Sequence, residues 1–155
     1  MKNKALSLFT LIALLFSCEP KKKTTITTNK EAIKTVFYNV ENLFDTKHQF
    51  KKQDGDFTPN GLYKWTEEKY HQKLSNIVTT LNELEADVIG LAEVENKKVL
   101  KDLVNKLTYA DLEIVHYESH DIRGIDVALL YNPKVLNLEG LSLIHISEPT
   151  RQEAI

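Results

Sequence analysis

Two acidic residues stand where apolar segments of this sequence end. Glu41 follows the apolar residues that begin at position 35, and Glu93 follows the unbroken apolar run at residues 88–92. Hard divalent cations such as Mg²⁺ are held by one or two carboxylates, while water and substrate phosphate fill the other positions. The two strand-end carboxylates therefore predict metal-assisted chemistry at one rim of a sheet.

The segments before these acids predict the strands that position them. Residues 35–41 alternate in polarity, so positions 36, 38 and 40 share one face, and Asn39 and Glu41 share the other. Residues 88–92 are apolar without alternation, which is typical of a strand covered on both faces. Asn39 and Glu41 are therefore expected to point in the same direction, toward the chemistry.

Further elements follow from periodicity and capping residues. A helix is predicted to begin after Thr66 and to carry an apolar stripe to Leu84, and a second helix after Asn96. Residues 45–64 are polar and rich in turn signals, so we predict a long loop, a kind of segment that is often functional. Strands are predicted at residues 112–117 and 126–131, and another begins within 135–138. The order of elements predicts a mixed α/β fold.

Composition limits the class of protein. The 155 residues carry a formal charge of −2, which argues weakly against a tight, sequence-independent binder of nucleic acid. A single cysteine excludes an internal disulfide.

The N-terminus is typical of a bacterial lipoprotein. A short basic segment at residues 1–4 precedes an apolar run at 5–16, and Cys18 follows in a lipobox-like context. We expect residues 1–18 to be a signal peptide, Cys18 to be the lipidated residue, and residues 19–33 to be a polar tether. The protein is then expected outside the cytoplasm on a membrane surface. The alternative is an ordinary signal peptide in which the cysteine is incidental.

The C-terminal residues 141–155 predict neither a clean strand nor a packed helix. They resemble the translated adapter tails found at the ends of open reading frames from draft sequencing. We therefore expect the native domain to occupy residues 34–140 of this chain and to be truncated near Gly140. His145 and Arg151 carry no functional prediction for this reason.

Four motifs in order resemble the endonuclease/exonuclease/phosphatase superfamily, which has the fold of DNase I. They lie at residues 37–45, 56–70, 87–96 and 123–131. The resemblance covers about residues 34–140 and implies a four-layer α/β sandwich, with two mixed sheets flanked by helices. This chain would form the N-terminal half.

The resemblance also implies roles for individual residues. Glu93 matches the principal Mg²⁺ ligand, Glu41 matches a position where an acid assists the metal, and Asn39 matches the asparagine beside the metal and the scissile phosphate. Mg²⁺ is the expected cofactor, with Mn²⁺ and Ca²⁺ as alternatives. Arg123 and Asp126 either form a plain ion pair in a loop or support the phosphate site.

The chain departs from the family pattern in its last quarter. The family requires a catalytic histidine motif, an Asp-x-Asn pair and a terminal Asp-His pair, and none of these follows Tyr131. The leading hypothesis is a lipid-anchored, Mg²⁺-dependent phosphodiesterase or nuclease, of which this chain is an inactive fragment. The alternative is a non-catalytic surface lipoprotein that binds a ligand with the same fold.

The substrate stays open among nucleic acid, phospholipid headgroups and sugar phosphates, and no protein partner is evident from the sequence. A third interpretation is that this exact chain is not a working protein. Half of a two-sheet sandwich would leave a long apolar sheet edge exposed, which predicts aggregation.

Overall fold

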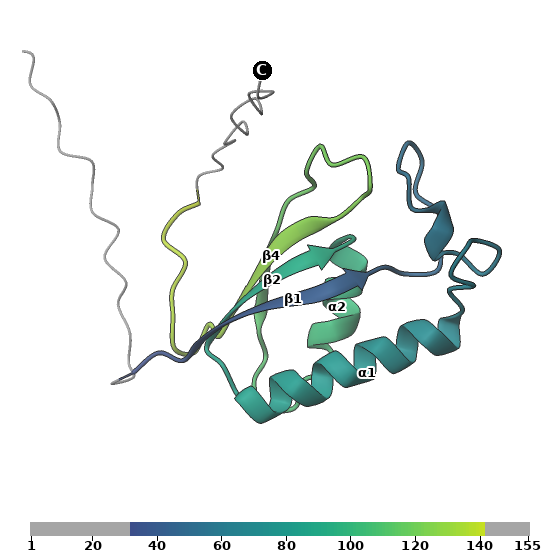
Figure 1. Ribbon diagram of the computed structural model, residues 1–155. Helices are drawn as coiled ribbons and strands as arrows, with labels where there is room; N and C mark the ends of the chain where they lie inside the picture. Colours follow the sequence, from purple (N-terminus) through teal and green to yellow (C-terminus); the bar gives the residue numbers. More distant parts are fainter. Residues whose placement is uncertain (1–31, 142–155) are drawn as a thin grey trace, which may run out of the picture.

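The computed structural model of the chain describes residues 32–141 (Figure 1). The predicted signal peptide with Cys18, most of the predicted tether and the C-terminal tail lie outside these residues. The described part contains β1 (Thr35–Leu43), a short 3-10 helix (Gly55–Phe57), α1 (Glu67–Leu84), β2 (Val88–Val94), α2 (Lys97–Val104), β3 (Glu113–His116) and β4 (Asp126–Tyr131).

The strands form one four-stranded sheet in the order β1-β2-β4-β3. β1 and β2 run parallel and are connected through α1, whereas β4 pairs antiparallel with both β2 and β3. The predicted mixed α/β class is therefore confirmed. The second sheet that the resemblance implies is not among residues 32–141.

Both helices begin at the predicted capping residues. The Thr66 side chain accepts a hydrogen bond from the Lys69 backbone N–H, and the Asn96 side chain accepts from the N–H groups of Lys98 and Val99. These contacts satisfy backbone donors that the first helical turn leaves unpaired.

We expect Asn96→Ala to lower the free energy of unfolding by about 1 kcal/mol, because α2 would lose its N-cap. Chemical denaturation of the purified chain measures this difference. Lys97→Ala, an exposed change in the first turn of α2, is the matched control. Equal midpoints for the two variants would contradict a stabilising role for the Asn96 cap.

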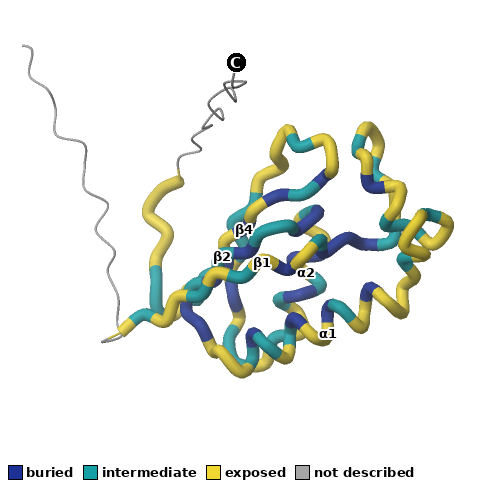
Figure 2. The backbone as a smooth tube through the Cα atoms, in the orientation of Figure 1, coloured by how far each residue is buried: buried dark blue, intermediate teal, exposed yellow. Residues whose placement is uncertain are grey.

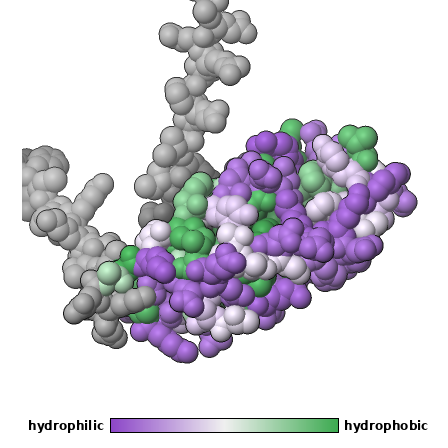
Figure 3. Space-filling view, turned by 60° about the horizontal axis from the view of Figure 1, so that its bottom comes forward, coloured by the Kyte–Doolittle hydropathy of each residue, from purple (hydrophilic) through white to green (hydrophobic). Residues whose placement is uncertain are grey.

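The helices cover one face of the sheet, and the core lies between the two layers (Figures 1 and 2). Burying such apolar side chains contributes about 1.5–3 kcal/mol each before the entropy of ordering is counted. The fully buried leucine and isoleucine side chains come from β1, both helices, β2 and β4: Leu43, Leu74, Leu81, Ile89, Leu91, Leu100, Leu103 and Leu130. The side of the molecule seen in Figure 3 is largely hydrophilic, with hydrophobic surface gathered in patches.

The opposite face of the sheet exposes apolar side chains. Phe37 on β1 is 75% exposed, and Val127 and Leu129 on β4 are 70% and 36% exposed. β1 is an edge strand, in line with the exposed sheet edge that was expected. A β2 covered on both faces was also expected, but among the described residues Val88, Gly90 and Ala92 on this face of β2 are only half-buried. Residues 136–140 lie over part of this face, where they line a pocket with Val88 and Leu129.

This open face predicts self-association of the 155-residue chain, because large exposed apolar patches are aggregation sites. We expect Val127→Lys to reduce light scattering and to raise the monomer fraction in sedimentation. Leu62→Lys adds the same charge at another exposed apolar residue, in the loop before α1, and is the control. An equal decrease in light scattering in both variants would show that the added charge, and not the open face of the sheet, determines self-association.

The predicted long loop between β1 and α1 is ordered by an aromatic cluster. The rings of Phe44 and Phe57 stack with centroids 4.1 Å apart, and Trp65 meets Phe57 edge-on. The Trp65 indole N–H also donates to the Phe44 carbonyl oxygen at 2.9 Å. This cluster fastens the loop to the end of β1, close to the residues predicted to act.

The predicted strand within residues 135–138 was wrong. The Asn132 carbonyl oxygen accepts hydrogen bonds from the backbone N–H groups of Val135 and Leu136, and the Asn132 side chain accepts from the N–H of Lys134. These bonds make a turn and use donors that a strand would offer to a neighbour, and Leu136 makes only an isolated bridge.

Neither helix within residues 32–141 has the length and apolar character needed to cross a membrane.

Candidate functional site

The two predicted carboxylates both stand at irregularities in adjacent parallel strands. Glu41 and Asn42 have φ values of +54° and +64°, and the pairing of β1 with β2 shifts register between Asn39 and Leu43. Glu93 has a φ of +64°, and the pairing of β2 with β4 shifts between Ala92 and Val94. Left-handed backbone at non-glycine residues costs free energy and gathers at functional sites. Bulges of this kind also redirect side chains next to active sites.

Hydrogen bonds bring the three predicted residues into one group. The Asn39 side-chain NH₂ donates to Glu93 Oε1 at 3.0 Å, and Asn39 Oδ1 accepts from the Glu41 backbone N–H at 2.8 Å. Asn39 therefore connects the two strand ends: it fixes one oxygen of the Glu93 carboxylate and holds the bulge that contains Glu41. The alternation in burial continues through Glu41, which is exposed as Asn39 is, although the φ of +54° at Glu41 departs from extended backbone.

Lys73 of α1 adds a positive charge beside these carboxylates. Its ammonium group donates to the Glu41 carbonyl oxygen at 2.7 Å. Burial holds the pKa of Lys73 below its usual value, while the negative charges of Glu41 and Glu93 act in the opposite direction. Both carboxylates thus act electrostatically on the same ammonium group.

The loop between β3 and β4 completes the surroundings of Glu93. Glu93, Ser119, Asp121, Arg123 and Asp126 line an open cavity of about 310 Å³. The exposed Arg123 guanidinium pairs with Asp121, with Nη2 and Oδ2 2.6 Å apart. This pairing, and to a smaller degree Glu93, keeps the pKa of Arg123 above its usual value. The cavity therefore combines a carboxylate and a guanidinium, the pair of charges that a metal–phosphate complex needs.

The structure does not show the ion pair that the sequence left open between Arg123 and Asp126. Asp126 is instead buried against His116, whose Nε2 lies 3.1 Å from Asp126 Oδ2, and Asp126 Oδ1 accepts from the Ser119 N–H at 2.9 Å. Arg123 and Asp126 nonetheless line the same cavity as Glu93. Their supporting role in phosphate binding stays a prediction.

Behind Glu93, the next acidic residue on the chain is enclosed. Glu95 is 1% exposed, and its carboxylate accepts from the Asp45 N–H at 2.6 Å and from the Gln49 side chain at 2.9 Å. Burial, together with the charges of Asp45 and Asp54, raises the pKa of Glu95 to about 7, although its two hydrogen bonds act to lower it. Glu95 thus fastens the loop after β1 to the end of β2.

The donor set around Glu93 fits a hard divalent cation. Glu93 supplies carboxylate oxygens and is only half-buried, so water and a phosphate oxygen have access to it. Glu41 is exposed, and its role as a second carboxylate ligand stays a prediction. Asn39 Oδ1 is occupied by the Glu41 N–H, so in this structure Asn39 orients the carboxylate and does not offer its own oxygen.

Sequence reasoning missed two residues of this region. Lys73 lies outside the apolar stripe of α1, so the sequence gives it no special role. It is identified as part of this region only by its hydrogen bond to the Glu41 carbonyl oxygen, 32 residues away in the sequence. The sequence analysis also gave His116 no role, yet its side chain is 2% exposed and paired with Asp126. Residues 113–116 do not alternate in polarity, so no local pattern marks His116 as an inward-facing residue.

No curated protein and no solved structure matches the chain. A family model described as Endonuclease/Exonuclease/phosphatase family matches residues 34–155. The match covers most of the chain, including residues 141–155. The chain therefore belongs to the Endonuclease/Exonuclease/phosphatase family, whose members are hydrolases of phosphate esters that generally use divalent metal ions.

Proposed function

We propose that this chain carries the metal-binding half of an Mg²⁺-dependent phosphodiesterase site. The observation that supports it most is the 3.0 Å hydrogen bond from Asn39 to Glu93, which joins two bulged strand ends. A carboxylate fixed on one oxygen retains its other oxygen for a cation. Glu93 would hold the ion, with Glu41 as a second carboxylate.

When bound, Mg²⁺ polarises a phosphoryl oxygen and offsets the negative charge that develops in the transition state. The residues of the chain position the groups around it. Asn39 keeps the Glu93 carboxylate oriented, Lys73 anchors the backbone of Glu41 to α1, and Arg123 places a positive charge at the cavity that Glu93 lines. Arg123 Nε and Nη2 already donate to Asp121, so a phosphate oxygen would meet the remaining donors of the guanidinium plane.

The proton-transfer residues belong to the part of the family pattern that is missing after Tyr131. The sequence contains no aspartate after Asp126, so neither an Asp-x-Asn nor an Asp-His pair follows. We infer that hydrolysis belongs to a full-length protein and that the 155-residue chain is inactive. The substrate class stays open among nucleic acid, phospholipid headgroups and sugar phosphates.

We also propose that Cys18 is lipidated and that the domain works outside the cytoplasm, tethered to a membrane through residues 19–33. The support is the order of a basic segment, an apolar run and a lipobox-like cysteine. Labelling of the expressing cells with a fatty-acid analogue, compared between wild type and Cys18→Ser, tests this proposal. Equal label in the two proteins would contradict it.

The test of function starts from the gene. Sequencing across the codons for residues 135–155 shows whether the frame continues into the missing motifs. The resulting protein is then assayed against DNA, phospholipids and sugar phosphates, with Mg²⁺ or with a chelator. We expect hydrolysis of at least one class that stops on chelation, whereas hydrolysis that persists in the chelator would contradict a metal-dependent site.

A non-catalytic binding module is the alternative, and the missing histidine motif favours it. It predicts Mg²⁺ binding by the full-length protein without turnover of any of the three substrate classes. Calorimetry with Mg²⁺ and the same assays therefore separate the two functions.

A further inference from the structure

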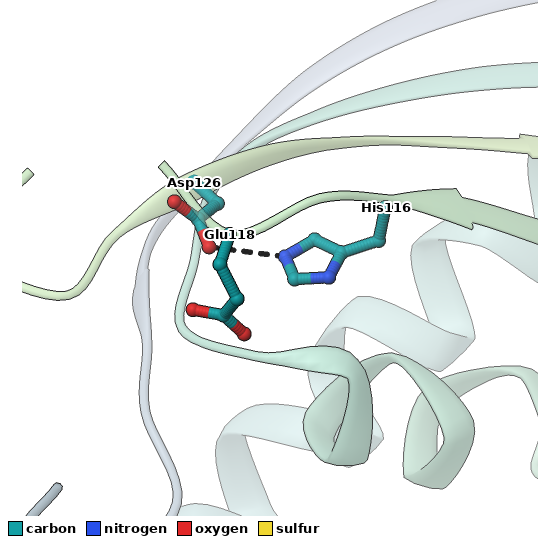
Figure 4. Close-up of side chains that lie close together, drawn as sticks. All are labelled: His116, Glu118 and Asp126. Atoms are coloured by element: carbon teal, nitrogen blue, oxygen red, sulfur yellow. Dashed lines mark hydrogen bonds and ion pairs between the residues drawn. The ribbon is translucent and has the colours of Figure 1, made fainter. Parts of the chain in front are cut away.

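We propose that His116, Glu118 and Asp126 form a second cation site, selective for Zn²⁺, that shares no ligand with the proposed Mg²⁺ site at Glu93 although Asp126 also borders the Glu93 cavity. One ligand atom from each of the three side chains lies within 4.8 Å of the others (Figure 4). His116 ends β3, Glu118 follows it in the connecting loop, and Asp126 begins β4. The three residues therefore lie at the two ends of the loop that connects β3 to β4.

The chemistry of these side chains differs from that at Glu93. An imidazole nitrogen with two carboxylate oxygens suits a borderline ion such as Zn²⁺, whereas Mg²⁺ prefers oxygen ligands and retains its water. Two carboxylates also balance the charge of a divalent ion, which matters because the side chains of His116 and Asp126 are only 2% and 1% exposed.

The spacing of the buried pair is close to what zinc requires. His116 Nε2 and Asp126 Oδ2 are 3.1 Å apart. Two ligands of a tetrahedral zinc ion with bonds of about 2.0–2.1 Å are separated by about 3.4 Å. Glu118 is exposed and has a long side chain, so it can move the remaining distance by a change of rotamer. Its exposure also leaves the fourth position to water.

Such an ion would act on the loop that reaches the cavity of Glu93. Residues 117–125 connect the two ends of the site, and Asp121 and Arg123 within this loop line the cavity. Asp126 Oδ1 already fixes one point of the loop through the Ser119 N–H. Zn²⁺ would add a bond to Glu118 and so limit the positions open to Arg123.

Calorimetric titration of the untagged 155-residue chain with ZnCl₂ tests the site. We expect one zinc equivalent to bind, and Glu118→Gln to weaken it by at least about 10-fold, in the range seen when a supporting group of a metal site is lost. Glu118 is exposed, so this variant leaves the packed pair intact. His116→Asn, which keeps a donor for Asp126 but has no imidazole, should abolish binding. The X-ray absorption spectrum of zinc-loaded wild type should show a histidine nitrogen ligand.

Three controls separate this site from others. Cys18→Ser and His71→Ala each remove another side chain able to bind zinc, and both should retain the wild-type affinity. Glu93→Gln should also retain it, so the zinc site can stand even where the Mg²⁺ site fails. Wild-type affinity in both Glu118→Gln and His116→Asn would overturn the proposal, as would loss of zinc in Glu93→Gln alone.

Discussion

Glu93→Gln is expected to lower metal-dependent hydrolysis by the full-length protein by about 10³-fold or more, equivalent to about 4 kcal/mol in the activation barrier. A neutral amide is a poor ligand where the ion requires an anionic oxygen, so the metal and its stabilisation of the transition state are lost together. The introduced amide still fits the space of the carboxylate, and its oxygen can accept the same hydrogen bond from the Asn39 NH₂ group while Asn39 Oδ1 still accepts from the Glu41 N–H. The fold should therefore survive.

Rates with saturating Mg²⁺, together with calorimetric Mg²⁺ affinities, measure this effect. Glu113→Gln is the matched control, because it makes the same chemical change at an exposed residue of the same sheet. It should leave both quantities unchanged. Unreduced activity in Glu93→Gln, with unchanged dependence on Mg²⁺, would show that the ion binds elsewhere.

The elements that local sequence determines were predicted well. Thr66 and Asn96 cap their helices as expected, and β4 has the predicted bounds because Asn132-Pro133 ends it. Caps, apolar stripes and turn residues act over three or four positions, so they are visible without a structure. The strand expected within 135–138 failed because a turn at Asn132 competed for the same backbone donors.

The sequence identified Asn39, Glu41 and Glu93 as site residues, but it did not predict how their backbone and side chains are arranged. Asn39 and Glu93 meet because β1 and β2 are adjacent and parallel, which the α1 crossover makes natural. The bulges at Glu41 and Glu93 could not be predicted, because they appear as register shifts between paired strands and depend on the partner strand as well as on the local sequence. The pairing of His116 with Asp126 depends on the register of β3 against β4, which no local signal specifies.

We expect the free energy of unfolding to fall by about 3 kcal/mol between pH 5 and pH 8 through the ionisation of Glu95. Its pKa is about 7 in the folded chain, against about 4.3 for an unfolded glutamate. Between these values the native state binds more protons than the unfolded state, so stability decreases as pH rises. The contribution is present at pH 5, decreases across the window, and is fully lost above pH 7.

Glu95→Gln is expected to remove this part of the pH dependence, because an amide does not titrate. Its oxygen can still accept from the Asp45 N–H, and Gln49 can rotate its amide to accept the new NH₂ group. The variant should therefore be more stable than wild type at pH 8 and close to it at pH 5. Urea unfolding at both pH values, in EDTA so that metal binding adds nothing, measures the two differences.

The comparison isolates Glu95 from its acidic neighbours. Asp45 and Asp54 are also buried, but they are present in both proteins and contribute to both pH profiles. Only the difference between the profiles belongs to position 95, and parallel profiles would show that Glu95 is ionised in the folded chain throughout the range. Profiles that meet at pH 5 and separate by pH 8 would show that Glu95 is neutral in the folded chain at pH 5 and carries a buried charge at pH 8. Glu95 lies two residues after the proposed metal ligand, so this change of charge would occur at the end of β2.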